Sequence, residues 1–290
     1  MIVRVWLYRG SVTAGEFEWD ESLYGGSAAY YATGRLPYPQ AMAEALAVEL
    51  GLDGHGRLLD VGCGPGSLAL LLAPLFEQVV GVDADREMIE AARREAAGRG
   101  VVNAEWVVAR AEQLPAELGR FRVATFAQSF HWMDRPRVAQ VVSAMIEPAG
   151  AWVHVGATTH RGVEEEHPPE PSPPRAQIAA LVRRYLGRDR RAGRQTLPGG
   201  TAGDEEAVMR AAGYPEPLRV MVPRGEVFSR SEDDIVASVY SLSSAAPHLF
   251  GDRQAAFEAD MRELLRRSSP SGRFYERARD IELVIWRRAP

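Results

Sequence analysis

With 290 residues, of which 46% are hydrophobic and 25% charged, the chain is long enough for one full-sized core and too apolar for wholesale disorder. Its formal net charge of −5 disfavours a nucleic-acid partner, because proteins that bind a phosphate backbone are normally basic. All 34 basic residues are arginine, which excludes lysine chemistry such as a Schiff base or a P-loop.

The first half of the chain predicts a helix followed by a parallel sheet. An aromatic, glycine-rich stretch, Tyr24–Tyr38, precedes a helix over Pro39–Leu50. Short apolar runs then alternate with segments of helical period, which is typical of strands wrapped by helices. The expected strands are Arg57–Val61, Val79–Val82, Ala104–Val108, Phe121–Phe126 and Ala151–Val155. The expected helices are Ser67–Phe76, Arg86–Gly98 and Arg135–Ile146.

After the fifth strand the pattern changes. Arg161–Pro174 is rich in proline and glutamate and predicts a mobile surface loop. The remaining expected elements are a helix Arg175–Leu186, an Arg/Gly-rich stretch Gly187–Gly203, a helix Asp204–Ala212, a strand Leu218–Phe228, helices Glu232–Ser243 and Arg253–Arg267, and a strand inside Phe274–Trp286.

The strongest local signal is the run Leu58-Leu59-Asp60-Val61-Gly62-Cys63-Gly64-Pro65-Gly66. An apolar strand leads directly into three glycines and then into a helix. Glycines allow a tight turn and a close approach to a ligand, because they carry no Cβ. The start of the helix would offer free N–H groups to an anion such as a carboxylate.

A second signal is the carboxylate that closes the next strand. Asp83 ends the run Val79-Val80-Gly81-Val82, a position that faces the ribose of a nucleoside in a doubly wound sheet. Ala84 and Met88 follow where contact with an adenine ring is expected. Many α/β proteins have a glycine turn or a strand-ending acid, but the two together at this spacing indicate a nucleoside site.

The glycine spacing helps to choose the nucleotide. It is G-x-G-x-G and not the G-x-G-x-x-G of dinucleotide-binding proteins, and Asp60 lies two residues before the first glycine. At these residues the chain resembles the class I S-adenosylmethionine-dependent methyltransferases, over about Leu58 to Gly156. The resemblance implies an α/β fold, with a Rossmann-like, doubly wound, mostly parallel seven-stranded sheet and helical cap or lid insertions. It also implies S-adenosyl-L-methionine as cofactor, S-adenosyl-L-homocysteine as product, and no metal.

In that family the glycine loop contacts the methionine part, Asp83 the ribose and Met88 the adenine. The run Ala109-Arg110-Ala111-Glu112-Gln113-Leu114-Pro115 is similar to a family segment near adenine, but Arg110 departs from its usual aspartate. Adenine contacts would therefore involve Ala111 and Glu112, unless Glu112 is only a solvated acid at a helix start. The cofactor candidates are Tyr30, Arg35, Asp60, Gly62, Cys63, Gly64, Gly66, Asp83, Ala84, Met88, Ala111, Glu112 and Gln128.

The segment after the fourth strand, Ala127 to Asp134, should line the cleft, because ligands of open sheets bind beyond the carboxyl ends of the strands. It resembles the A-x-x-x-H-W-x-D stretch of small-molecule methyltransferases of the trans-aconitate methyltransferase-like type. It also lacks the Asn/Asp-Pro-Pro-Tyr motif of enzymes that methylate nucleobase or glutamine nitrogens. Asp134 more simply caps the following helix than binds a metal.

His131 is the candidate general base for a hydroxyl or amine acceptor, since an imidazole pKa near ~6.5 suits proton transfer. Alternatively, His131 and Trp132 only shape the pocket. The N-terminal stretch resembles a family segment in which Tyr30 or Tyr31 would face the sulfonium and Arg35 its carboxylate; the alternative is an aromatic cluster that anchors the cap. The substrate candidates are Tyr31, His131 and Trp132, with Ser241–Phe250 as a selectivity wall by fold analogy.

The sequence thus predicts one methyltransferase domain, 1–290. It comprises an N-terminal cap segment 1–50, a cofactor-binding core 51–160, a variable lid 161–203, and a C-terminal part 204–290 with a helical substrate-side insertion 231–267. The expected reaction moves a methyl group to an oxygen (hydroxyl or carboxylate) of a small metabolite or secondary metabolite. N- or C-methylation, a non-catalytic cofactor-binding protein and an NAD-dependent oxidoreductase are the alternatives. The sequence does not predict an oligomeric state.

The expected location is the cytoplasm, with no membrane partner. The single cysteine, Cys63, cannot form an internal disulfide, which suits a reducing compartment. The run from Met1 to Tyr8 is too short for the apolar part of a signal peptide. No stretch approaches the ~20 apolar residues that a membrane helix needs.

Overall fold

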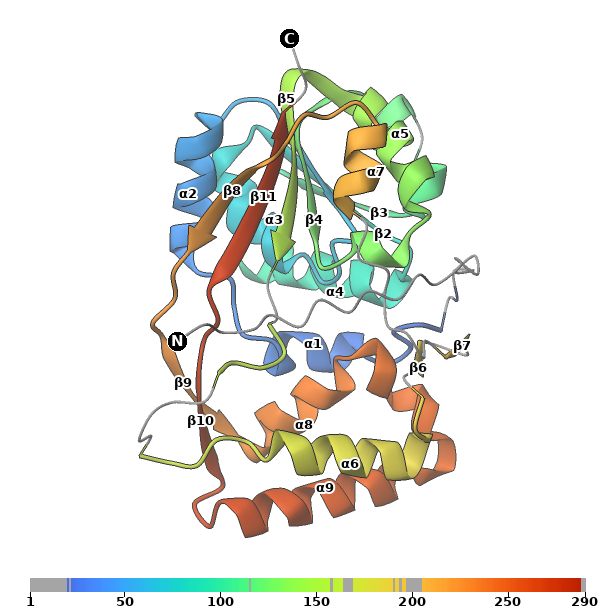
Figure 1. The fold of residues 1–290 in the computed structure, drawn as a ribbon, viewed down its shortest axis with the longest axis vertical. Coiled ribbons are helices and arrows are strands. Elements are labelled where there is room, and N and C mark those ends of the chain that lie inside the picture. Colours follow the sequence, from blue (N-terminus) through green and yellow to red (C-terminus); the bar gives the residue numbers. More distant parts are fainter. Residues whose placement is uncertain are drawn as a thin grey trace.

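The computed structural model describes residues 20, 22–114, 116–156, 159–163, 169–189, 191–192, 195–196 and 205–287. A seven-stranded sheet in the order β3-β2-β1-β4-β5-β11-β8 forms the upper half of the molecule in Figure 1. Neighbours among β1 to β5 pair in parallel, and β11 is antiparallel to both β5 and β8. The predicted Rossmann-like, mostly parallel sheet is therefore confirmed. Its strands are β1 Arg57–Val61, β2 Gln78–Asp83, β3 Ala104–Val108, β4 Phe121–Ala127, β5 Ile146–Gly156, β8 Leu218–Val222 and β11 Ile281–Arg287.

Helices cover both faces of this sheet, which explains why the central strands are apolar without alternation. On β1, Leu58 packs into a cluster with residues of α2, α3 and α4, whereas the next residue, Leu59, packs on the opposite face with residues of α5 and α7. The helices on the first face are α2 Gln40–Leu50, α3 Ser67–Leu72 and α4 Arg86–Gly98. Those on the second face are α5 Arg135–Met145 and α7 Glu205–Ala211.

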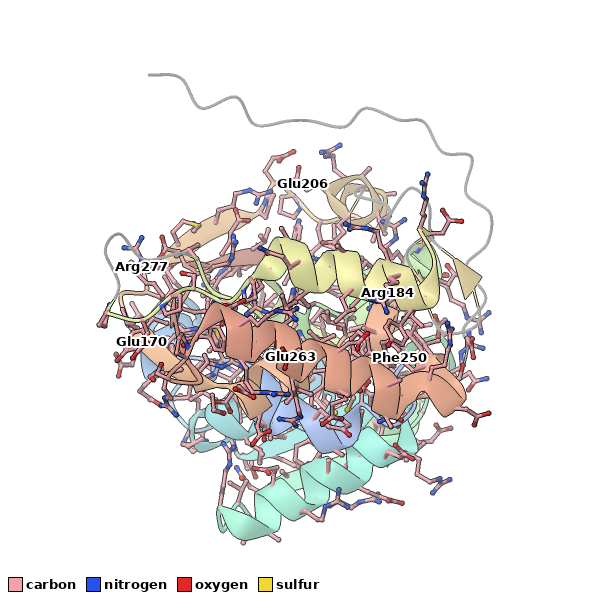
Figure 2. The ribbon with its side chains drawn as sticks, turned by 90° about the horizontal axis from the view of Figure 1, so that it is seen from below. Glu170, Arg184, Glu206, Phe250, Glu263 and Arg277 are labelled. Atoms are coloured by element: carbon pink, nitrogen blue, oxygen red, sulfur yellow. The ribbon has the colours of Figure 1, made fainter. Side chains whose placement is uncertain are left out.

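A helical cap forms the lower half of the molecule, facing the carboxyl ends of the parallel strands (Figure 1). Figure 2 shows α6 and α9 side by side across its outer surface. Phe257 and Phe274 are fully buried in its core, where they pack with Tyr240. The cap comprises α1 Ala28–Gly34, α6 Arg175–Leu186, α8 Glu232–Tyr240, α9 Gln254–Ser268 and a hairpin of β9 Val227–Ser231 with β10 Arg273–Arg277.

Short elements complete the described chain. Two strands of two residues each, β6 Arg191–Ala192 and β7 Gln195–Thr196, pair with one another. The 3-10 turns are Ala73–Leu75, Ala111–Gln113, Ala116–Leu118, Phe130–Trp132, Ser243–Ala245 and Pro247–Arg253. Asp134 caps α5 by accepting the backbone N–H of Arg137 at 3.2 Å, as predicted.

Two predicted strands were wrong in extent. The single strand expected over Leu218–Phe228 is two strands, because Pro223 and Gly225 interrupt it: β8 stays in the large sheet and β9 joins the cap. The strand expected inside Phe274–Trp286 is likewise divided into β10 and β11. The helix expected to reach Phe76 ends at Leu72 and continues as a 3-10 turn that contains Pro74.

The helix α1 was not predicted within the aromatic stretch. It packs closely on α8: a Cβ at Gly34 would lie 2.4 Å from the carbonyl oxygen of Ala237. Some predicted features lie outside the described residues, namely the run Met1–Tyr8, Asp204, and parts of Arg161–Pro174 and Gly187–Gly203. Within the described ranges, no helix combines the length and apolarity needed to cross a bilayer.

Candidate functional site

The carboxyl ends of β1, β2 and β4 line a cavity that also includes Tyr31 of α1 in its wall. We call it the glycine-loop cavity, because Gly62 and Gly64 form part of its wall. A second cavity, the cap cavity, shares Tyr31, Gly62 and Gly64 with the first. The two spaces therefore meet along the loop between β1 and α3, which the sequence singled out.

The three loop glycines have positive φ angles of 68°, 54° and 79°, but they serve different needs. A Cβ at Gly62 would lie 2.4 Å from the Cβ of Ser129, and one at Gly66 would lie 2.5 Å from the Trp106 ring. At Gly64 the nearest neighbour would be the Tyr31 ring, 4.0 Å away. Packing therefore requires the outer two glycines, whereas the middle one faces open space that a ligand could fill.

Asp83 lines the glycine-loop cavity at the end of β2. Its Oδ2 accepts the backbone N–H of Gly64 at 2.8 Å, and its Oδ1 accepts that of Asp85 at 2.9 Å. Burial raises the pKa of Asp83 to about 6, although these hydrogen bonds partly offset the effect. Each carboxylate oxygen keeps lone pairs free, so both could accept ribose hydroxyls. Ala84 and Met88 line the same wall.

Asp60 lies deeper, at the border of the cap cavity, and is only 1% exposed. The Thr125 hydroxyl donates to its Oδ1 at 2.8 Å. Burial raises the pKa of Asp60 to about 7, with hydrogen bonds from Thr125 and the Ala69 backbone opposing the rise. The neighbouring Cys63 is buried with its thiol toward the Gly64 carbonyl, and burial raises the pKa of this thiol.

The cap places Tyr31 and Arg35 against these groups. Tyr31 lines both cavities, and the Arg35 guanidinium lies 4.5 Å from the centre of its ring. Arg35 lines the cap cavity, where its Nη2 donates to the Ser241 carbonyl at 2.7 Å. Its buried Nε has no hydrogen-bond partner among the residues that the structure describes. Tyr30, by contrast, packs against Tyr240 with 4.9 Å between ring centres, inside the cap core.

Arg110, Ala111 and Glu112, which follow β3, also line the glycine-loop cavity. The Glu112 side chain is only 12% exposed. Its Oε1 accepts the backbone N–H of Asp134 at 2.9 Å, and its Oε2 lies 3.4 Å from Nε of Arg110. Glu112 is therefore not a solvated acid, because it holds the start of α5 against the cavity.

The segment after β4 divides between two cavities. Gln128, Ser129 and Trp132 line the glycine-loop cavity, and Gln128 has a positive φ of 56°, which is uncommon for a residue with a side chain. His131 instead lines a third cavity, between α7 and the sheet. We call this the α7 cavity. Gln128 and Ser129 also line it, so one loop separates the two spaces.

Several residues that line the cavities were not among the candidates. Tyr24 and Met133 line the glycine-loop cavity, and Tyr38 and Thr159 line the cap cavity. The two tyrosines lie in the aromatic N-terminal stretch, which was the available signal. Among the predicted cofactor residues, Gly66 and Tyr30 do not line these two cavities. Within the described ranges, no three His, Cys, Asp or Glu side chains gather closely enough to hold a metal ion.

Comparison with known proteins shows what the core is similar to. Residues 58–150 match the family described as "Methyltransferase domain". The uncharacterized methyltransferase YcgJ of Bacillus subtilis is 32% identical over 100 residues, which cover 34% of this chain and 40% of that protein. The 2-heptyl-1-hydroxyquinolin-4(1H)-one methyltransferase of Mycobacteroides abscessus is 34% identical over 39% of this chain and 51% of its own.

The matched stretch thus spans about half or less of these curated relatives. Shorter stretches also match RNA methyltransferases. Among solved structures, a putative type II methyltransferase from Anaeromyxobacter dehalogenans superimposes with a TM-score of 0.51 at 24% identity, over 87% of this chain and 96% of that one. This likeness concerns the fold alone.

Proposed function

We propose that this chain is a class I S-adenosylmethionine-dependent methyltransferase that transfers a methyl group to an oxygen of a small metabolite or secondary metabolite. The match of residues 58–150 to the family described as "Methyltransferase domain" supports this proposal. One observation carries the proposal. Gly64, the Asp83 carboxylate and the Tyr31 ring line a single cavity, and the space beside Gly64 is open. This is the combination that an adenosyl sulfonium compound requires.

In this proposal each wall binds one part of the cofactor. Asp83 accepts hydrogen bonds from the ribose hydroxyls, and Met88 and Ala111 pack against the adenine ring. The methionine part follows the glycine loop toward the cap cavity, where Arg35 pairs with its carboxylate. The Nε of Arg35, which has no partner within the described part of the chain, fits this role, since a buried donor without an acceptor is unfavourable.

The bound cofactor supplies a methyl group that the positive sulfur has already activated. The chain itself has to orient the acceptor and exclude water, which can be worth ~7–11 kcal/mol. Tyr24 and Tyr31, from the N-terminal segment, and Trp132, from the segment after β4, all line the cavity. We propose that the acceptor enters between these walls and that Tyr31 and Trp132 contact it.

The small-molecule acceptor is supported by the net charge of −5 and by the relative whose name specifies a hydroxyquinolone. A carboxylate acceptor would be ionised and would need no general base. For a hydroxyl acceptor, His131 remains the proposed base, provided that the acceptor reaches the wall of the α7 cavity. His131→Ala should then lower turnover by about 100-fold with little change in cofactor affinity. Full turnover in this variant would reject the role.

Calorimetric titration with S-adenosylhomocysteine, S-adenosylmethionine and NADH tests the cofactor. We expect saturable binding of the first two and none of NADH. Asp83→Asn should weaken binding, whereas Glu87→Gln, an exposed change on the first turn of α4, should not. Binding of NADH alone would reject the proposal in favour of an oxidoreductase.

A methyl-transfer assay over hydroxyl, carboxylate, amine and carbon acceptors tests the reaction itself. Transfer to oxygen is expected. Transfer only to nitrogen or carbon would correct the acceptor atom. Tight cofactor binding without transfer to any member of the panel would favour a non-catalytic cofactor-binding protein.

A further inference from the structure

The order of the strands indicates where the base of the proposed cofactor lies. Gly64 follows β1, Asp83 ends β2, and β3 is the next strand of the sheet. Asp83 is paired in register with Val108, the last residue of β3, and its carbonyl accepts the backbone N–H of Ala109 at 3.0 Å. With the methionine part at the end of β1 and the ribose at the end of β2, the base extends toward the end of β3. This placement rests on the proposed function.

Two ionisable side chains line the glycine-loop cavity at this end, namely those of Arg110 and Glu112. Arg110 is the only cationic side chain among the described residues that line the cavity. The roles proposed above for the ribose, the ring face and the carboxylate leave it without a function. Its position beyond β3 therefore needs a separate explanation.

Glu112 holds Arg110 at the wall of the cavity. Its Oε2 lies 3.4 Å from Nε of Arg110, and its Oε1 accepts the backbone N–H of Asp134 at 2.9 Å. Nε of Arg110 is buried, but 39% of the whole side chain is exposed, so other parts of it are accessible to a ligand. Because a guanidinium is planar, a contact at Nε restricts the directions in which its terminal N–H groups can point.

The turn that carries this pair is itself held in place. The backbone N–H of Gln113 donates to the Arg110 carbonyl at 3.0 Å, which closes the 3-10 turn. Nε of Arg137, on α5, donates to the Glu112 carbonyl at 3.0 Å. A ligand would therefore meet a wall that is ordered in advance, which lowers the entropy cost of a specific contact.

The pair presents a hydrogen-bond donor next to an acceptor. Arg110 can only donate. Glu112 can still accept, because a carboxylate offers about four acceptor sites and its contacts with Asp134 and Arg110 leave some of them free. The similar family segment usually has an aspartate in place of Arg110, and an ionised aspartate could not donate to a ligand.

The edge of an adenine ring has the complementary pattern. A ring nitrogen that accepts, either N1 or N7, lies beside the amino group at C6, which donates. A 6-oxopurine carries an oxygen at C6 instead, and this acceptor would face the carboxylate of Glu112 without a proton between them. The pair is therefore suited to adenine and unsuited to its 6-oxo counterpart.

We propose that Arg110 is a specificity-determining residue of the cofactor site. Its terminal N–H groups donate to a ring nitrogen of adenine, and Glu112 accepts from the amino group at C6. Met88 and Ala111 then contact the faces of the ring, while Arg110 and Glu112 bind its edge. The cavity selects an adenosyl compound over the corresponding inosyl compound.

Matched ligands test this selection on the unmodified full chain. S-Inosylhomocysteine has an oxygen in place of the amino group at C6, and 1-deaza- and 7-deaza-S-adenosylhomocysteine each have a C–H group in place of one ring nitrogen. Calorimetry should show at least about tenfold weaker binding than S-adenosylhomocysteine for the inosyl compound and for at least one deaza analogue. Full affinity for the inosyl compound, or for both deaza analogues, would overturn the proposal.

Arg110→Met tests whether the guanidinium causes the loss. Affinity for S-adenosylhomocysteine should fall about tenfold, whereas affinity for the sensitive deaza analogue should not fall further, because its contact is already absent. Equal losses for both ligands would mean that Arg110 only supports the wall, and would refute the proposal. The ligand series on the unmodified chain decides the question if this variant does not fold.

Arg137→Met is the matched control. It also removes a guanidinium that contacts Glu112, but Arg137 is exposed and is not among the residues that line the cavity. This variant should keep the preference of the unmodified chain for S-adenosylhomocysteine over the sensitive deaza analogue. Loss of the preference in Arg137→Met as well as in Arg110→Met would assign it to the turn as a whole and refute a specific role of Arg110.

The same titrations separate this proposal from the proposed function. If the chain binds S-adenosylhomocysteine but has equal affinity for the analogues, the cofactor assignment stands and the role of Arg110 is refuted. If the chain does not bind S-adenosylhomocysteine at all, the cofactor assignment fails, and the proposal for Arg110 fails with it.

Discussion

The core and cap differ in how each builds its side of the cavity. In the core, the groups proposed to bind the cofactor are close in sequence: Gly62 and Gly64 follow one strand, and Asp83 ends its parallel neighbour. Because parallel strands end at the same edge, pairing of β1 with β2 is enough to bring these groups together. In the cap, α1 and α8 touch across some 200 residues of chain. Local signals therefore define the core site, whereas long-range packing defines the cap site.

A buried ion network holds the cap elements in place. Glu276 on β10 is 3% exposed and accepts from Arg230, from Arg175 and from the backbone N–H of Gly162. Arg230, itself 4% exposed, also donates to the carbonyl of Gly34 at 3.1 Å. The hairpin is thereby connected to α1, which carries Tyr31 over the cavity.

The largest effect should come from breaking this network. Glu276→Ala leaves Arg230 buried without its carboxylate, so the free energy of unfolding should fall by ~3–5 kcal/mol. Urea denaturation measures the change. Glu263→Ala is the control: this glutamate lies on the outer surface of α9 (Figure 2), pairs with Arg266 and Arg267, and is 48% exposed. Its removal should cost ~0–1 kcal/mol. Equal losses would mean that the network does not hold the cap.

The second prediction isolates the ligand-facing glycine of the core. Gly64→Ala and Gly51→Ala introduce the same methyl at nearly the same positive φ, 54° and 59°, and neither Cβ has a neighbour closer than 4.0 Å. Both should lose a similar ~1–2 kcal/mol of stability from the backbone. Only Gly64 faces the cavity, so only its variant should lose S-adenosylhomocysteine affinity, by up to about 100-fold for ~1–3 kcal/mol of steric conflict. Unchanged affinity would move the cofactor off the glycine loop.

The contrast between local signals in the core and long-range packing in the cap explains which features could be predicted from the sequence. The parallel strands and the roles of the glycines and Asp83 follow from local pattern. The strand boundary at Pro223 was also present in the sequence, but the partner of β9 was not, because pairing with β10 is a long-range event. Tyr24 reaches the cavity because of how the cap folds, and burial raises the pKa of its hydroxyl. Its proximity to the site could not be derived from its neighbours in the chain.

The direction in which a side chain points was also not predictable from the sequence. His131 and Trp132 are adjacent in one 3-10 turn, yet Trp132 lines the glycine-loop cavity and His131 lines the α7 cavity. A motif identifies the turn but not the wall that each residue faces, since a rotation of the turn would exchange them. Tyr30 and Tyr31 are likewise adjacent in α1, yet Tyr30 packs against the cap core and Tyr31 lines the cavities.

The third prediction tests whether the cap takes part in cofactor binding. Arg35→Met keeps an unbranched side chain and removes the guanidinium that lies 4.5 Å from the centre of the Tyr31 ring. Affinity for S-adenosylhomocysteine should fall about tenfold, because a charge-assisted hydrogen bond is lost. Affinity for 5′-methylthioadenosine, which lacks the carboxylate, should not change. A parallel loss for both ligands would indicate that Arg35 only supports the fold.

The smallest expected effect is a dependence on pH, both of the stability of the ligand-free protein and of its affinity for the cofactor. Burial raises the pKa of Asp83 to about 6, so the ligand-free protein gains stability as pH falls through this range, since protonation removes a buried charge. Cofactor affinity should change in the opposite direction. Only the ionised carboxylate accepts both ribose hydroxyls, so affinity should fall, by less than about tenfold, between about pH 7 and pH 5.

Asp83→Asn should abolish the slope of affinity with pH, because the amide does not titrate in this range. Asp60 is the competing source, since burial raises its pKa to about 7 and it borders the cap cavity. A slope that persists in Asp83→Asn and disappears in Asp60→Asn would assign the titration to the deeper carboxylate. Asp83 would then not be the group that binds the ribose, and the strongest local inference from the core would be lost.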